Sequence, residues 1–200
     1  MPEMPEVQAH AERMTAALAG RRLARFELLN FAALKTFDPP VDGAIGHQLV
    51  EVGRRGKYLL FRYDNDQTHV VHLMQGGRLR PDPKRSRKPK LGLGRWIFDP
   101  ADGDDDDQAW MLTEAGSERK AGVWAVTGDP IGQEPLDHLG PEASELDRDD
   151  LAQVLGAHSK RLHGLLRDQR TIAGLGRMLA NEICYAAKVS PFANASKLAD

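Results

Sequence analysis

The chain has 200 residues, of which 41% are hydrophobic, and its formal net charge at pH 7 is −2. This length suits one elaborate domain or two small ones. No apolar run approaches the roughly 18 residues that a membrane span needs, and the N-terminus lacks the basic-then-apolar order of a signal peptide. We therefore expect a cytoplasmic protein with no membrane contact. The one cysteine, Cys184, excludes an internal disulfide and a multi-cysteine zinc site, and we expect it to be an ordinary core residue.

The charge is distributed unevenly along the chain. Residues 78–95 contain eight basic residues and one acid, whereas residues 102–107 are almost wholly acidic. The net charge gives no overall attraction to nucleic acid, so a nucleic-acid partner must be recognised through local charge. Taken alone, either run is more often a solvated loop than a binding surface.

The first expected element is a helix that begins almost at the N-terminus. Apolar residues recur at helical spacing from Val7 to Leu18. Pro5 suits a first helical position, and Gly20 suits the end of the helix.

Short β-type segments follow, separated by turn-forming Gly, Asp, Asn and Pro. Because no helical periods lie between them, we expect an antiparallel sheet or sandwich and not a parallel sheet. The expected strands cover residues 24–29, 58–63, 69–73, 95–98, 109–112 and 122–126.

The last part of the chain is predicted to be helical. Residues 133–144 have the polar, Pro/Gly-rich character of an interdomain linker. Beyond them, three groups of apolar residues each share a helix face: Leu151, Val154 and Leu155; Leu162, Leu165 and Leu166; Leu175, Leu179, Ile183 and Ala186. The expected fold class is α+β, with a helix and an antiparallel β-sandwich in residues 1–132, a linker at 133–145, and a helical domain at 146–200.

The first residues could carry chemistry. Removal of Met1 would leave Pro2 with a secondary amine, and a generic α-amino group titrates near ~7.7 to 8.0 against ~10.4 for lysine. An uncharged amine can attack a sugar carbon and form an imine. Glu3 is placed to protonate a departing sugar oxygen or relay a proton, whereas Glu6, one turn inside the helix, is expected to fix the chain end. The alternative is that Pro2 is only a permissive second residue and both acids are ordinary helix caps.

MPEMPEV, residues 1–7, resembles the opening of the formamidopyrimidine-DNA glycosylase and endonuclease VIII family. That family uses its terminal proline as a nucleophile, so the resemblance implies this role for Pro2. RRGKYLLF, residues 54–61, resembles the family's strand turn that carries a lysine into the active site, which implies that Lys57 contacts the sugar. The alternative for Lys57 is an ordinary hairpin lysine.

Two further segments resemble DNA-contacting parts of the family. HLMQGGRLR, residues 72–80, resembles the loop that fills the gap left by the extruded nucleotide, with Gln75 in the place of the usual wedge methionine and Arg78 beyond it. LLRDQRTIAGLGRMLANEI, residues 165–183, resembles the helix-two-turns-helix signature, in which a glycine turn and a helix N-terminus grip phosphate. The DNA contacts implied there are Gly176, Arg177 and Asn181. LKTFDPP at 34–40, LTEAGSERKAGVWAV at 112–126 and LGPEA at 139–143 look like the actinobacterial, endonuclease VIII-like branch.

The sequence departs from the family pattern at three places. Arg177 and Leu179 replace the usual asparagine and tyrosine of the helix-two-turns-helix signature. The wedge segment Arg-Arg-Phe-Gly aligns with residues 119–122, in which Arg119 and Lys120 are basic but the aromatic residue is absent. One cysteine cannot supply the four ligands of the family's C-terminal zinc finger, so we expect no cofactor in this chain and a truncated helical domain.

The leading hypothesis is a monomeric, nucleoid-associated DNA glycosylase with abasic-site lyase activity, which acts on oxidised bases in double-stranded or single-stranded DNA. The alternative is a catalytically silent homologue that binds damaged DNA. An interaction module resembling the helix-two-turns-helix part of ribosomal proteins ranks last, because it covers only the end of the chain.

Overall fold

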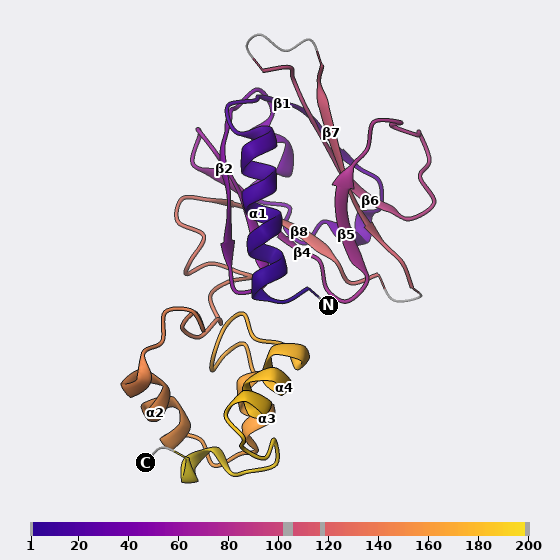
Figure 1. Cartoon of the computed structure of the whole chain (residues 1–200). Coiled ribbons are helices and arrows are strands. Elements are labelled where there is room, and N and C mark those ends of the chain that lie inside the picture. The colour runs from indigo at the N-terminus through magenta and orange to yellow at the C-terminus, as the bar shows by residue number, and fades with distance from the viewer. Residues whose placement is uncertain (1, 102–105, 117–118, 199–200) are drawn as a thin grey trace.

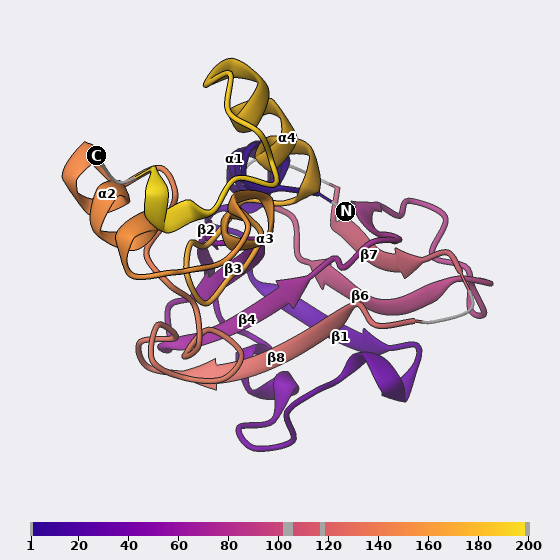
Figure 2. The same cartoon turned by 90° about the horizontal axis from the view of Figure 1, so that it is seen from below.

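The first two thirds of the chain fold into a helix and a β-sandwich (Figures 1 and 2). The structure is a computed structural model that describes residues 2–101, 106–116 and 119–198. The elements of this part are α1 (Met4–Leu18), β1 (Leu23–Leu28), β2 (Leu49–Arg55), β3 (Tyr58–Tyr63), β4 (Gln67–His72), β5 (Gly77–Pro81), β6 (Gly92–Phe98), β7 (Gln108–Glu114) and β8 (Gly122–Thr127), with short 3-10 turns at Phe31–Ala33 and Val41–Ala44.

Two four-stranded antiparallel sheets within the described residues form the sandwich. Their strand orders are β1-β6-β7-β5 and β2-β3-β4-β8. The sheets meet through side chains such as Phe61 of β3 and Trp96 of β6, whose fully buried rings stack with centroids 5.4 Å apart. Such a ring pair contributes about 0.5–1.5 kcal/mol beyond its buried area. The predicted antiparallel sandwich is confirmed.

Helix α1 closes one open side of the sandwich. Its residues Val7, Ala11, Met14 and Leu18 are all buried in the main core, as their helical spacing predicts. The Thr15 hydroxyl donates to the carbonyl of Val52 at 3.1 Å and accepts from its amide at 2.8 Å. This exchange ties α1 to β2 and so fixes where the N-terminus lies.

Strands β2 and β5 were not among the expected strands. Both lie at the edge of a sheet, where one side of the strand has no ladder partner. Strand β5 reads GRLRP, with glycine and proline at its ends and exposed arginines, and β2 reads LVEVGRR. Neither strand contains an apolar run, so a search for apolar runs overlooks both, whereas the other two edge strands, β1 and β8, were predicted.

The remaining described residues form a smaller helical part with α2 (Arg148–Gly156), α3 (Leu162–Leu166), α4 (Arg177–Ala186) and a 3-10 turn at Ala195–Lys197. These elements surround a second apolar core, which includes Leu165, Ile172 and Cys184. Cys184 is buried, as predicted. None of the described helices is long and apolar enough to cross a membrane.

The predicted face of α4 is wrong. Leu175 precedes the helix, Ile183 is 38% exposed, and the buried positions of the helix are Ala180 and Cys184. The predicted face was counted from Leu175, which is buried in the loop before the helix. Two small residues one turn apart let α4 approach its neighbours closely.

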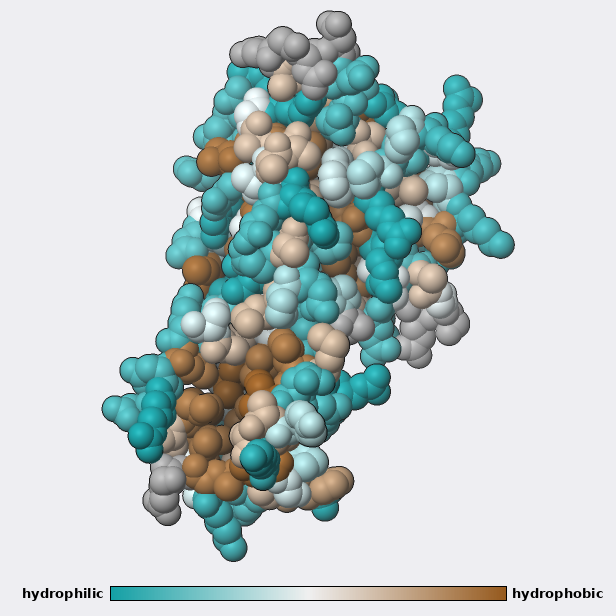
Figure 3. All heavy atoms as spheres, in the orientation of Figure 1, coloured by the Kyte–Doolittle hydropathy of each residue, from teal (hydrophilic) through white to brown (hydrophobic). Residues whose placement is uncertain are grey.

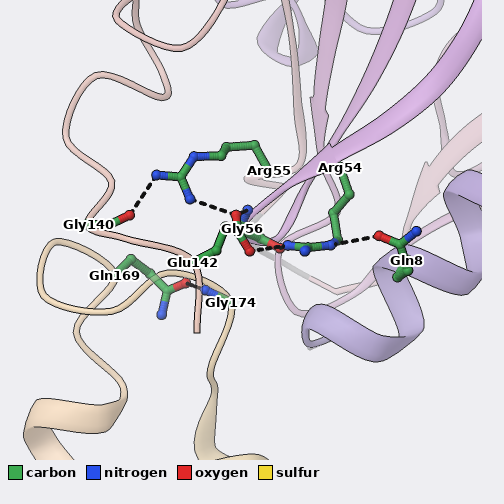
Figure 4. Close-up of polar contacts among 8 residues, drawn as sticks. All are labelled: Gln8, Arg54, Arg55, Gly56, Gly140, Glu142, Gln169 and Gly174. Atoms are coloured by element: carbon green, nitrogen blue, oxygen red, sulfur yellow. Dashed lines mark hydrogen bonds and ion pairs between the residues drawn. The ribbon is translucent and has the colours of Figure 1, made fainter. Parts of the chain in front are cut away.

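The sandwich and the helical part are joined at Glu142, within the predicted linker (Figure 4). Its buried carboxylate accepts from Arg54 Nη1 at 2.5 Å, Arg55 Nη1 at 2.6 Å and the Gly56 amide at 2.5 Å. Burial would raise the pKa of Glu142, but these donors together hold it below the usual value. Glu142 also forms a parallel bridge with Ala173, so one residue contacts both parts of the molecule.

Candidate active site

A cleft of about 560 Å³ lies where the N-terminus, the sandwich and the helical part meet. Five of the predicted site residues line it: Glu3, Lys57, Gln75, Gly176 and Arg177. Sequence reasoning did not single out the other five lining residues: Tyr58, His72, Arg167, Gln169 and Met178.

Glu3 lies buried against the N-terminus of α4. Its Oε2 accepts from the amides of Gly176 at 2.8 Å and Leu179 at 3.0 Å, and its Oε1 accepts from the amide of Met178 at 2.8 Å. The helix dipole and these unpaired amides favour a carboxylate there. The family resemblance assigned this helix end to phosphate, but the structure places Glu3 on it. The Glu3 side chain also takes part in the capping box at the start of α1.

Gly176 is required by this close approach. A Cβ atom at this position would overlap the carboxyl group of Glu3. The backbone of Gly176 has φ −125°, which any residue can adopt, so space and not backbone conformation selects glycine here.

Two backbone contacts hold the start of the chain in place. The amide of Glu3 donates to Glu6 Oε2 at 3.0 Å, and the amide of Met4 donates to the carbonyl of Gly174 at 3.0 Å. Glu6 therefore contacts the chain end, while Pro2, half-buried, directly precedes the buried Glu3. Pro2 is not itself among the residues that line the cleft, but these contacts fix its neighbour Glu3, which does line it.

Lys57 lies in the tight turn between β2 and β3. Gly56, with φ +56°, makes this turn possible, since the left-handed region favours glycine. Only 5% of Lys57 is exposed. Burial lowers its pKa, the negative charge of Glu3 opposes that shift, and the positive charge of Arg167 adds to it. Its amine is therefore uncharged more often than that of a surface lysine.

His72 and Tyr58 form a cross-strand pair beside Lys57, with ring centroids 4.4 Å apart. Burial and the positive charge of Lys57 lower the pKa of His72 to about 4. Its Nδ1 accepts from the amide of Met74 at 3.1 Å, so the neutral ring carries its proton on Nε2. His72 therefore offers a hydrogen-bond donor at neutral pH.

The cleft carries more positive than negative charge. Lys57, Arg167 and Arg177 line it, whereas Glu3 is its only lining carboxylate among the described residues. Gln169 holds the loop beneath them: it accepts from the amide of Gly174 at 3.0 Å and donates to the carbonyl of Leu175 at 2.7 Å. Guanidinium and ammonium groups arranged in this way suit phosphate oxygens.

The other predicted DNA contacts lie outside the cleft. Arg78 is exposed on β5, and Arg119 lies beside the carbonyl of Lys90, to which it donates at 3.4 Å. Lys120 is exposed beside Ala121, which is fully buried and donates its amide to Glu114. Asn181 lies on the exposed side of α4.

Nothing in the described residues fits a structural metal. No group of three His, Cys, Asp or Glu side chains in residues 2–101, 106–116 and 119–198 could hold a metal ion. Cys184 is the one cysteine of the sequence and is buried in α4, so a thiolate-rich zinc set does not fit this donor set.

Comparisons with known proteins agree with this geometry. The family model described as the formamidopyrimidine-DNA glycosylase N-terminal domain matches residues 1–109. The chain is 32% identical to the formamidopyrimidine-DNA glycosylase of Carboxydothermus hydrogenoformans, covering 100% of this chain and 71% of that protein. It is also 32% identical to that of Heliobacterium modesticaldum, over 100% of this chain and 72% of that protein.

A solved structure shares the fold. The complex between the Lactococcus lactis Fpg and an abasic site containing DNA superposes with a TM-score of 0.83 at 22% identity, covering 98% of this chain and 70% of that one. These matches place the chain among the DNA glycosylases of DNA repair. Within that class it belongs to the formamidopyrimidine-DNA glycosylase family. The actinobacterial, endonuclease VIII-like branch stays a prediction.

Proposed function

We propose that this glycosylase excises oxidised bases and then cleaves the resulting abasic site, with the amine of Pro2 as its nucleophile. The observation that carries the proposal is the cleft itself. Glu3 and Lys57 are both buried and line the same cleft, and Pro2 directly precedes Glu3. Buried ionisable groups in a cleft are characteristic of catalytic sites.

The reaction begins when the uncharged amine of Pro2 attacks C1′ of the damaged nucleotide. The new bond from nitrogen to C1′ replaces the bond to the base, which leaves with its electron pair and takes up a proton. The nitrogen then gives up its proton, the C1′–O4′ bond breaks with its electron pair moving to O4′, and the freed nitrogen lone pair forms an iminium. Loss of a proton from C2′ expels the 3′ phosphate, and water releases the sugar and regenerates the amine.

Glu3 and Lys57 have different tasks in this scheme. Glu3 carries a proton to O4′, because its carboxyl group lines the cleft directly after Pro2. Lys57 contacts the sugar, and its lowered pKa keeps a fraction of its amine able to accept a proton. Arg167 and Arg177 bind the flanking phosphates, because a guanidinium offers several donors to phosphate oxygens.

The positive charge of the cleft supports DNA as the binding partner. The chain has a net charge of −2, yet its cleft is lined by three cations and one carboxylate. The solved Lactococcus lactis relative is bound to an abasic site containing DNA. An extruded nucleotide would enter the cleft and leave its phosphates at the rim.

Trapping with borohydride tests the nucleophile. Protein with a native N-terminus is mixed with an abasic-site oligonucleotide and borohydride, which reduces the iminium to a stable amine, and the crosslinked residue is mapped by mass spectrometry. We expect the crosslink on Pro2 and its loss when the terminal amine is acetylated. A Lys57→Ala variant should trap more slowly, whereas Lys35→Ala, an exposed lysine outside the cleft, is the matched control.

A catalytically silent damage-binding homologue is the second candidate. It is favoured by Gln75 in the wedge turn and by buried Ala121 at the place where the family carries an aromatic residue. DNA binding without any crosslink, unaffected by acetylation of Pro2, would establish this alternative in place of the enzyme.

A further inference from the structure

A row of basic side chains leads away from the cleft along β5. Gln75 lines the cleft, and β5 begins two residues later. Arg78 and Arg80 are exposed on this strand, while Leu79 between them is buried. Side chains two positions apart on a strand point the same way and lie about 7 Å apart. The row therefore starts at the mouth of the cleft.

Helix α1 adds to the same row. Burial lowers the pKa of His10, and three neighbouring cations lower it further: Arg13, Arg78 and Arg80. Arg13 of α1 and the two arginines of β5 therefore all lie within electrostatic range of His10. The β5 ridge, as we define it, consists of Arg13, Arg78 and Arg80 with His10 among them. Figure 3 shows hydrophilic side chains over this side of α1 and β5.

The acids near β5 are already engaged elsewhere. Asp82 is buried and accepts from Arg95 at 2.7 Å, and Asp107 pairs with Arg85. Among the described residues, no carboxylate forms an ion pair with a member of the β5 ridge. Arg78 and Arg80 therefore keep their positive charge at the exposed face of β5, where it attracts an extended anion.

The shape of the ridge favours a polyanion. Its arginines are exposed side chains in a row along a strand and a helix. Duplex DNA carries one charge per ~1.7 Å of its axis, so a duplex leaving the cleft along β5 would present phosphates to each ridge residue in turn. Such contacts fix orientation and read no sequence.

We propose that the β5 ridge binds the phosphate backbone of one of the two duplex arms that flank the lesion. The ridge lies on one side of the cleft, so the other arm does not reach it. This inference rests on the proposed function only in taking DNA as the substrate. It assigns to Arg13 and Arg80 a binding role that the lesion pocket does not need.

Binding to asymmetric duplexes tests the ridge. Each duplex carries a stable abasic-site analogue between minimal arms, and one arm or the other is extended by roughly 10 base pairs, about one helical turn. Wild-type protein should gain affinity from extending one arm only. The double variant Arg13→Ser/Arg80→Ser should lose that gain, and its slope of log affinity against log salt should fall by about one for each phosphate contact removed.

Arg25→Ser is the matched control, because Arg25 is an exposed arginine on β1, at the opposite edge of the same sheet. The Arg25→Ser variant should keep both the gain in affinity from the longer arm and the wild-type slope of log affinity against log salt. The ridge is excluded if the double variant keeps the gain, or if Arg25→Ser loses as much as the double variant does. Borohydride trapping of wild-type protein is measured separately, on a minimal duplex that carries a natural abasic site in place of the stable analogue. A failure of the catalytic proposal is thereby distinguished from a failure of the ridge.

Discussion

At the scale of single residues, several polar groups have environments that only one protonation state satisfies. His69 is fully buried between the sheets. Its Nδ1 accepts from the indole N–H of Trp96 at 3.0 Å, and its Nε2 lies 2.9 Å from the carbonyl of Val41. The neutral ring meets both partners, whereas a proton on Nδ1 would face the N–H of Trp96. Burial therefore lowers the pKa of His69 to about 4, although the Val41 carbonyl opposes the shift.

The first prediction is acid sensitivity through His69. Its pKa is lower in the folded state than the ordinary value of 6.5, so the unfolded chain binds more protons between these two pH values. Stability is therefore present above pH 6.5 and is lost as the pH falls toward 4, by up to about 1.4 kcal/mol per pH unit for each such histidine. His72 acts in the same direction. Urea unfolding between pH 7.5 and 4.5 measures the slope of unfolding free energy against pH.

The variant His69→Gln should reduce the slope of unfolding free energy against pH by the contribution of about one histidine. The contribution of His72 should remain. His138→Gln, which changes an exposed histidine, is the control and should leave the slope unchanged. An equal slope in His69→Gln and wild-type protein would contradict the argument.

At the scale of elements, α4 and the N-terminus of the chain depend on each other. Glu3 accepts from the amides of Gly176, Met178 and Leu179, and Gly176 leaves the room for it. A Cβ in place of the Gly176 hydrogen would displace the carboxylate from the helix end. The start of α4 would then lose its acceptor, and the site would lose the group placed to protonate the sugar.

The second prediction is a large effect of Gly176→Ala. We expect an unfolding free energy lower by about 1–3 kcal/mol, the usual cost of overpacking, and trapping at an abasic site at least roughly tenfold slower. Gly164→Ala, in helix α3, is the matched control, because its Cβ would meet nothing within 4 Å. That change should be neutral or stabilise by up to about 1 kcal/mol. Equal behaviour of the two variants in unfolding and in trapping would contradict the close approach.

The helices and strands also show how much of the fold could be predicted from the sequence. Helix α1 and six of the strands have clear apolar patterns, so they could be predicted from residue spacing. Strands β2 and β5 carry charged residues and glycine among few apolar ones, so their sequences give no such pattern. The pairing of Glu3 with Gly176 joins positions more than a hundred residues apart, which local spacing cannot reveal. Family motifs indicated Glu3, Lys57 and Gly176 separately, while His72 and Arg167 were found only through the cleft.

At the scale of the whole molecule, the cleft exists only while the sandwich and the helical part keep their relative position. Figure 4 shows the junction that holds them. Arg54 and Arg55, at the end of β2, converge on Glu142, and Arg55 also donates to the carbonyl of Gly140 at 2.6 Å. Gln169 and Gly174 lie across the same junction and lead to the loop that carries Gly176. A change at Glu142 should therefore reach the cleft although Glu142 does not line it.

The third prediction follows for Glu142→Gln. The substitution leaves two largely buried guanidinium groups, 10% and 15% exposed, without their carboxylate. Removing one partner of a buried ion pair lowers the unfolding free energy by about 3–5 kcal/mol. The control is Glu51→Gln, because the exposed ion pair of Glu51 and Arg62 contributes at most about 1 kcal/mol. Hydrogen exchange should accelerate in Glu142→Gln at the β2–β3 turn and at residues 169–176 together, because both ends of the junction open at once. Faster exchange at the turn alone, with residues 169–176 protected as in wild-type protein, would show that the helical part is held by other contacts and that the cleft does not depend on this junction.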